Sequence, residues 1–131
     1  EGRKVSVSDL KYIHERKTSA LLCCSVRLGG MSANCTPGQL RALTDFGYHV
    51  GLAFQVIDDI LDVTQSSEKL GKTAGKDAAA EKPTYVTLLG LDRARKFSAD
   101  LREQAIETLV IFDVRARRLV ELTDFITQRK F

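Results

Sequence analysis

The stretch TPGQLRALTDFGYHVGLAFQVIDDILDV, residues 36–63, decides the fold of this chain. Thr36 can cap a helix, Pro37 suits the first helical position, and Gln39 can complete the reciprocal capping bonds. Apolar or small residues then recur at alternating steps of three and four, which is the spacing of one helix face. These residues are Leu40, Leu43, Gly47, Val50, Phe54, Ile57 and Leu61. The pattern predicts one long helix, running to about Val63, with a buried stripe.

A second line of residues on the same helix passes from small side chains to polar ones. Its members are Thr44, Gly47, Gly51, Gln55, Asp58 and Asp62. The small residues have two interpretations, because they can wall an empty space or let another helix pack closely. The sequence leaves both open.

Three aspartates stand in the otherwise apolar run FQVIDDILD, residues 54–62. Asp58 and Asp62 are one helical turn apart, so their oxygens can approach one ion, while Asp59 points about 100° away. Oxygen ligands suit a hard cation such as Mg²⁺. A solvated acidic face is the alternative, although the helix dipole disfavours acids near a C-terminus. Because like charges repel, we expect the loss of Asp58 to leave stability unchanged or to raise it.

The rest of the 131 residues also has helical patterns, and no segment alternates polar and apolar residues long enough to predict a strand. We expect a first helix from Ser8 or Asp9 to Leu28, closed by Gly29 and Gly30. Further helices are expected over residues 84–90, 91–112 and 114–129, and a polar loop over residues 66–82. The length fits one domain, so we expect an all-α helical bundle over residues 1–131.

A lysine interrupts the apolar stripe expected on the first helix. The stripe consists of Leu10, Ile13, Leu21, Cys24 and Leu28, with Lys17 in its middle. Because residues 20–26 are apolar almost all round, we expect this part to be buried. A lysine there needs an anion nearby or must extend out from the helix edge. Thr18 could donate a hydroxyl beside it, whereas His14 and His49 are expected to be structural.

The predicted loop contains LGKTAGKDAAAEK, residues 70–82, in which glycines stand beside lysines. Glycine lets backbone N–H groups approach an anion, and Lys72, Lys76 and Lys82 supply positive charge. A flexible solvated loop would have a similar composition. Taken with the aspartates and Lys17, however, the loop favours a diphosphate site in which Mg²⁺ and lysines share the negative charge.

Composition excludes several other classes of protein. The net charge of +3 is small, and no basic stripe interleaves with aromatic residues, so we expect no nucleic-acid partner. No run is long and apolar enough to predict a membrane span. Cys23, Cys24 and Cys35 lack metal-ligand spacing, so we interpret them as small buried hydrophobic residues. This fits a reducing compartment, and we expect a cytoplasmic location.

Together, these motifs resemble a known family, the trans-prenyltransferases that include farnesyl and geranylgeranyl diphosphate synthases. FQVIDDILD is similar to their second aspartate-rich motif with its preceding Phe-Gln, and HERKTSALL, residues 14–22, to their Lys-Thr motif. LGKTAGKDAAAEKPTYVTLLGLDRAR, residues 70–95, resembles the segment that follows, especially in bacterial and plastid-type enzymes. The resemblance covers the chain from about Val7 and implies the C-terminal portion of the isoprenoid synthase fold.

The resemblance also implies roles for individual residues. Asp58, Asp59 and Asp62 match the motif that holds one Mg²⁺ in the family, mainly through the first aspartate. The lysines that contact the allylic diphosphate match Lys17 and Lys72 and, less closely, Lys82. Residues close to the developing allylic cation match Thr18 and Gln55. Thr44, Gly47 and Gly51 would help to wall the space for the prenyl chain.

The family reaction is a condensation of an allylic diphosphate with isopentenyl diphosphate, by prenyltransferases that are usually homodimers. Synthases of the family are about twice as long as this chain, and their first aspartate-rich motif and isopentenyl diphosphate site lie upstream of everything here. The chain therefore resembles the C-terminal half of a synthase and is expected to be inactive alone. The alternative is a non-catalytic partner subunit or an inactive fragment that associates with an active synthase.

Overall fold

The computed structural model describes residues 4–69 and 83–129, the side chains of 67–69 excepted, and every element in this part of the chain is a helix. The α-helices are α1 (Val7–His14), α2 (Ala20–Ser32), α3 (Pro37–Lys69), α5 (Tyr85–Leu89), α6 (Leu91–Thr108) and α7 (Arg117–Thr127). Two shorter elements join them, the π-helical η1 (Glu15–Ser19) and the 3₁₀-helical η2 (Val110–Ala116). The all-α prediction is confirmed.

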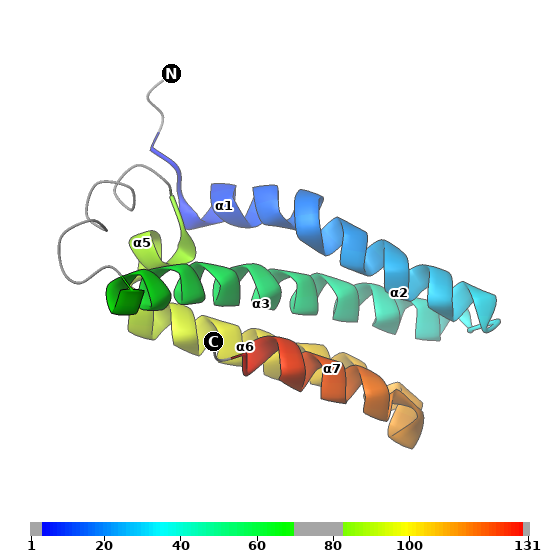
Figure 1. The fold of residues 1–131 in the computed structure, drawn as a ribbon. Coiled ribbons are helices and arrows are strands. Elements are labelled where there is room, and N and C mark those ends of the chain that lie inside the picture. The colour runs from blue at the N-terminus through cyan, green and yellow to red at the C-terminus, as the bar shows by residue number, and fades with distance from the viewer. Residues whose placement is uncertain (1–3, 70–82, 130–131) are drawn as a thin grey trace.

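The long helix α3 lies at the centre of the bundle, with α1 and α2 along one side and α6 and α7 along the other (Figure 1). Its predicted start is confirmed, because the Gln39 N–H donates to the Thr36 hydroxyl at 3.2 Å and the Thr36 N–H donates to the Gln39 side chain at 2.9 Å. The helix continues beyond the predicted end at Val63. The Ser66 hydroxyl donates to the Asp62 carbonyl at 2.7 Å, so the first residue of the expected loop is helical.

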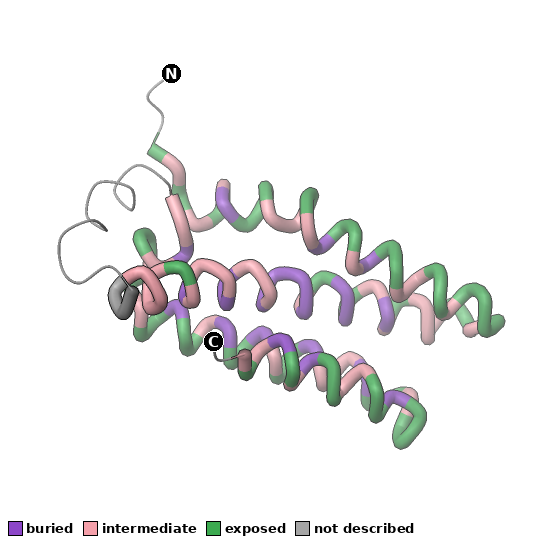
Figure 2. The backbone as a smooth tube through the Cα atoms, viewed as in Figure 1, coloured by how far each residue is buried: buried purple, intermediate pink, exposed green. Residues whose placement is uncertain are grey.

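Both sides of α3 are buried, which is why its apolar residues exceed one stripe (Figure 2). One core cluster joins its C-terminal half to α1, α5 and α6, and includes Val56, Ile60 and Tyr85. A second cluster joins its N-terminal half to η2, α6 and α7, and includes Phe46 and Val50. A helix that is apolar on most faces belongs in the interior of a bundle.

The first helical segment differs from the prediction at both ends. It begins at Val7, because Ser6 is the N-cap and exchanges capping bonds with Asp9. It ends at Ser32 rather than before Gly29. Gly30 remains helical, and a Cβ built there would come within 2.5 Å of Leu43 Cδ1, so this glycine permits close packing instead of ending the helix.

The buried face of this segment was also predicted wrongly. Leu10 is buried, but Ile13 is half exposed, and beyond it Leu21 and Leu28 are 68% and 56% exposed. The buried positions are instead Ser19, which ends the π turn, and Cys23. A π turn bonds i to i+5 and so holds more residues than an α turn, which rotates every later side chain relative to the earlier ones. A pattern counted at an α-helical period therefore follows the wrong face after Glu15.

The C-terminal helices break at positions where no local residue pattern predicts a break. A single helix was expected over residues 91–112, but α6 ends at Thr108. Asp113 adopts φ 50° and ψ −136° inside η2, a conformation that no helix can contain. The final helix α7 consequently begins at Arg117 rather than at Val114.

Candidate diphosphate and metal site

One face of the second half of α3 carries the predicted polar line. Gln55 and Asp58 are half-buried, and Asp62, one turn further on, is exposed. Asp58 and Asp62 thus form a pair of carboxylates accessible from one side. This donor set fits a hard divalent cation that keeps part of its water or shares phosphate oxygens. In the described part of the chain, no three His, Cys, Asp or Glu side chains gather closely enough to hold a metal by themselves.

Asp58 already has a cationic partner that the sequence analysis missed. Arg129, beyond the end of α7, places Nη2 2.6 Å from Asp58 Oδ1. Its guanidinium also lies 4.5 Å from the centre of the Phe54 ring. The expectation that Asp58 can be removed without loss of stability assumed that this carboxylate only repels its neighbours. That assumption is wrong, because removal of Asp58 leaves Arg129 without this carboxylate. A separation of 71 residues along the chain gave no local signal for the pair.

Asp59 faces a different neighbour from Asp58. Its Oδ2 accepts a hydrogen bond at 2.9 Å from the backbone N–H of Tyr85, the first residue of α5. An acid at a helix N-terminus satisfies a free donor and complements the helix dipole. Neighbouring helical positions point about 100° apart, as predicted. Asp59 therefore faces α5, away from the pair formed by Asp58 and Asp62.

The charge of Asp59 also affects the ionisation of Tyr85, which is fully buried. Its ring packs 5.3 Å from His14 and 5.7 Å from Phe97, measured between ring centres. Burial raises the pKa of the Tyr85 hydroxyl far above its usual value, and the negative charges of Asp59 and Glu15 add to the effect. Tyr85 therefore remains a neutral phenol and belongs to the core.

The small residues of α3 serve close packing, one of the two interpretations left open by the sequence. A Cβ at Gly47 would lie 2.6 Å from Cys23 Cα, and a Cβ at Gly51 would lie 2.6 Å from Ser19 Cα. Both glycines are buried. The Thr44 hydroxyl accepts a hydrogen bond from Arg27 at 2.6 Å. For Gly47 and Gly51, the expectation that they wall a space for the prenyl chain is wrong.

This packing sets the Lys-Thr segment against the helix that bears the aspartates. Lys17 and Thr18 lie in η1, whose last residue Ser19 sits against Gly51. The two helical segments are antiparallel (Figure 1), so residues before Ser19 lie beside residues after Gly51. Asp58 follows Gly51 by about 10 Å along α3. Lys17 is exposed rather than buried, which leaves its ammonium group accessible to an anion.

Two predicted diphosphate ligands, Lys72 and Lys82, lie outside the described residues, as does the loop over residues 70–82. A hollow of about 820 Å³ lies between α3, α6 and α7 and is lined in part by Arg95 and Arg102, but Asp58 and Asp62 do not line it. We place the candidate site on the carboxylate face, because the chemistry of the side chains, and not the size of a hollow, selects a ligand.

The cysteines are all free, but only one has the predicted environment. Cys23 is buried, Cys35 is half-buried and Cys24 is exposed. Burial raises the pKa of the Cys23 thiol above its usual value, although Arg27 opposes the effect. The exposure of Cys24 follows from the same rotation of α2 that exposes Leu21.

Comparison with known proteins places this geometry in context. A model of the polyprenyl synthetase family matches residues 1–113. The chain belongs to the polyprenyl synthetase family. The resemblance inferred from the aspartate-rich and Lys-Thr motifs is thereby confirmed.

Relatives of this polyprenyl synthetase chain include a chloroplastic geranylgeranyl pyrophosphate synthase from Capsicum annuum, with 49% identity over 126 residues. The match covers 95% of this chain and 34% of the relative. The chain thus spans about a third of the length of the curated relatives it matches.

Solved structures share the fold of this family member. A farnesyl/geranylfarnesyl diphosphate synthase from Zymomonas mobilis has 25% identity and a TM-score of 0.80, over 96% of this chain and 40% of that one. A geranyltransferase from Helicobacter pylori, complexed with magnesium and isoprenyl diphosphate, has 32% identity and a TM-score of 0.71, over 97% of this chain and 42% of that one. In the described residues, no helix combines the length and apolar character needed to cross a bilayer.

Proposed function

We propose that this chain supplies the diphosphate-ionising face of a Mg²⁺-dependent prenyltransferase in isoprenoid biosynthesis. The observation that carries the proposal is the contact between Ser19 and Gly51, which sets the Lys-Thr segment against the helix that bears Asp58 and Asp62. Membership of the polyprenyl synthetase family supports it. The substrates would be an allylic diphosphate and isopentenyl diphosphate.

The roles of the side chains follow from their charge and exposure. Asp58 and Asp62 would hold Mg²⁺, with Asp59 retained as the cap of α5. The Helicobacter pylori geranyltransferase structure also contains magnesium, which supports the choice of ion. Bound Mg²⁺ would supply positive charge to the oxygens of the departing diphosphate. Lys17 would bind the same diphosphate, joined by Lys72 and Lys82 from the loop.

The same groups would stabilise charge at the transition state rather than transfer protons. Lys17 keeps a compact positive charge near the leaving group, which is an electrostatic task. Thr18 and Gln55 are polar and neutral, so we assign them to the surroundings of the allylic cation. Attack by the double bond of isopentenyl diphosphate and loss of a proton would complete the condensation.

Assembly and location are part of the proposal. We propose that residues 1–131 form the C-terminal half of a synthase domain, and that the whole protein is a homodimer. The relative from Capsicum annuum is chloroplastic, so a plastid joins the cytoplasm as a candidate location.

The test is Asp58→Ala in the whole protein that carries this segment, assayed with radiolabelled isopentenyl diphosphate and an allylic diphosphate. Turnover should fall by about two orders of magnitude or more, because one metal ligand is lost. Asp124→Ala is the matched control, since this carboxylate also pairs with an arginine, Arg102, but lies away from the aspartate motif. Wild-type turnover in Asp58→Ala would refute the assignment.

A further inference from the structure

The ion pair between Arg129 and Asp58 joins the end of the chain to the first aspartate of the candidate metal site. We propose that Arg129 is a built-in counter-cation for Asp58 in the metal-free protein, and that a divalent cation must displace it from Oδ1 in order to bind. The inference rests on the proposed function, because it takes Asp58 as a metal ligand. Arg129 thereby becomes a positioning residue that sets metal affinity.

The guanidinium is held in place by more than the carboxylate. Its Nε donates to the Ile126 carbonyl at 3.1 Å, and the group lies over the Phe54 ring. The Arg129 side chain is only 16% exposed, whereas that of Asp58 is 38% exposed. An arginine with this degree of burial and several contacts has less freedom to lose on pairing than an exposed one, so we expect the pair to form in solution.

Arg129 and a metal ion compete for the Asp58 carboxylate because both are positively charged. The Arg129 guanidinium reduces the repulsion between Asp58 and Asp62 that a cation would otherwise relieve. A metal at Oδ1 would meet a positive group 2.6 Å from the same atom. Arg129 therefore has to leave this oxygen before the metal can take it. The loss of this ion pair weakens metal binding relative to a protein that has no cation at position 129.

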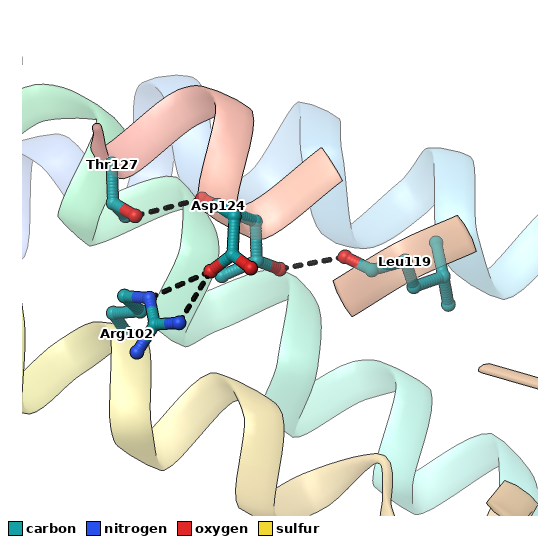
Figure 3. A network of polar contacts seen from close by, with 5 residues as sticks. Arg102, Leu119, Asp124 and Thr127 are labelled. Carbon is teal, nitrogen blue, oxygen red and sulfur yellow. Dashed lines mark hydrogen bonds and ion pairs between the residues drawn. The ribbon is translucent and has the colours of Figure 1, made fainter. Parts of the chain in front are cut away.

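Displacement would also change the end of α7. Arg129 links the last turn of this helix to α3 through Asp58 and Phe54. The other polar link from α7 that the structure describes, between Arg102 of α6 and Asp124, lies one turn earlier and does not involve α3 (Figure 3). Metal binding should therefore loosen residues 126–129 while it leaves the Arg102–Asp124 link intact.

The first measurement is the affinity for Mn²⁺ alone, followed by electron paramagnetic resonance, in wild type, Arg129→Gln and Arg102→Gln. Arg129→Gln should bind Mn²⁺ roughly three- to tenfold more tightly than wild type, because the competing pair is lost. Arg102→Gln, which removes a comparable pair elsewhere, should bind like wild type. Arg129→Lys keeps the charge and should lie close to wild type, and helical circular dichroism confirms that each variant is folded.

The second measurement is amide hydrogen exchange over residues 126–129. In wild type, exchange should rise when Mn²⁺ is added, whereas in Arg129→Gln it should already be fast and should not respond. Unchanged or weaker Mn²⁺ binding by Arg129→Gln would overturn the inference, since it would mean that Arg129 is neutral toward the metal or orients Asp58 for it.

An Asp58→Asn variant separates this inference from the proposed function. If Asp58→Asn weakens Mn²⁺ binding but Arg129→Gln does not strengthen it, the metal site stands and only the competition fails. If Asp58→Asn binds Mn²⁺ as wild type does, the metal site itself is refuted, and the inference falls with it.

Discussion

Adjacent aspartates on α3 have separate tasks because a helix turns by about 100° per residue. Asp59 points to the start of α5 and accepts the Tyr85 N–H, while Asp58 points to the end of α7 and pairs with Arg129. Only Asp62 is left exposed. Of three like charges in five residues, two are thus stabilised by contacts within the fold. The repulsion apparent in the sequence is smaller in the folded protein.

His49 provides a pH-dependent test at the scale of one residue. Burial lowers the pKa of His49 below its usual value of 6.5, the charge of Asp45 opposes this, and Lys11 adds to it. The unfolded chain therefore binds a proton more readily than the folded one, so stability should be lost as pH falls through about 6.5. His49→Gln should show a smaller drop in Tm between pH 7.5 and 5.5. Equal drops in both proteins would mean that His49 does not contribute.

The contact between η1 and α3 governs the arrangement of the site at the scale of helices. We expect Gly51→Ala to lower the free energy of unfolding by about 1–3 kcal/mol, because its Cβ meets the backbone of Ser19 at 2.6 Å and the backbone must move. Gly29→Ala is the matched control, since nothing lies within 4 Å of the added Cβ. It should stabilise the protein by up to about 1 kcal/mol through helix propensity. Urea unfolding measures these free energies, and an unchanged value for Gly51→Ala would contradict the predicted clash.

Sequence alone predicted the parts of the site that depend on local chemistry. The capping exchange between Thr36 and Gln39 involves near neighbours, so its residue types reveal it. The separation of Asp59 from the Asp58 and Asp62 pair follows from helical period alone. The partner of Asp58 comes from the far end of the chain, and such a contact is fixed only by tertiary packing. The rotation of α2 could not be predicted either, because the π turn in η1 leaves no composition signal.

At the scale of the molecule, large apolar side chains are exposed on several of the described helices. The exposed large side chains on α1, α2 and the start of α3 are Tyr12, Ile13, Leu21, Leu28, Met31 and Tyr48. Leu21 and Leu28 among them belong to the stripe that the sequence predicted to lie in the core.

We expect the 131-residue chain to self-associate in a concentration-dependent way and to form no prenyl product alone. The reason is the apolar face of α2 together with a chain that spans about a third of its curated relatives. Light scattering after size-exclusion chromatography should show less association for Leu21→Glu. Val114→Glu is the control, because Val114 lies on η2 and is more exposed than Leu21, and it should associate like wild type. Product formation by the isolated chain, measured with radiolabelled isopentenyl diphosphate, would contradict the expected inactivity.

The π turn in η1 also has a consequence for insertions and deletions. Because a π turn accommodates one residue more than an α turn, the deletion of one residue from Glu15–Ser19 would restore α-helical bonding and leave α2 facing as it does now. Cys23 would keep its place against Gly47, and the half-buried Leu22 and Val26 would keep their neighbours. The regular turns of α2 hold no such extra residue, so the deletion of one residue after Cys23 would turn the rest of that helix by about 100°. A comparison of family members should find single-residue gaps tolerated between residues 15 and 19 and excluded from the turns that follow.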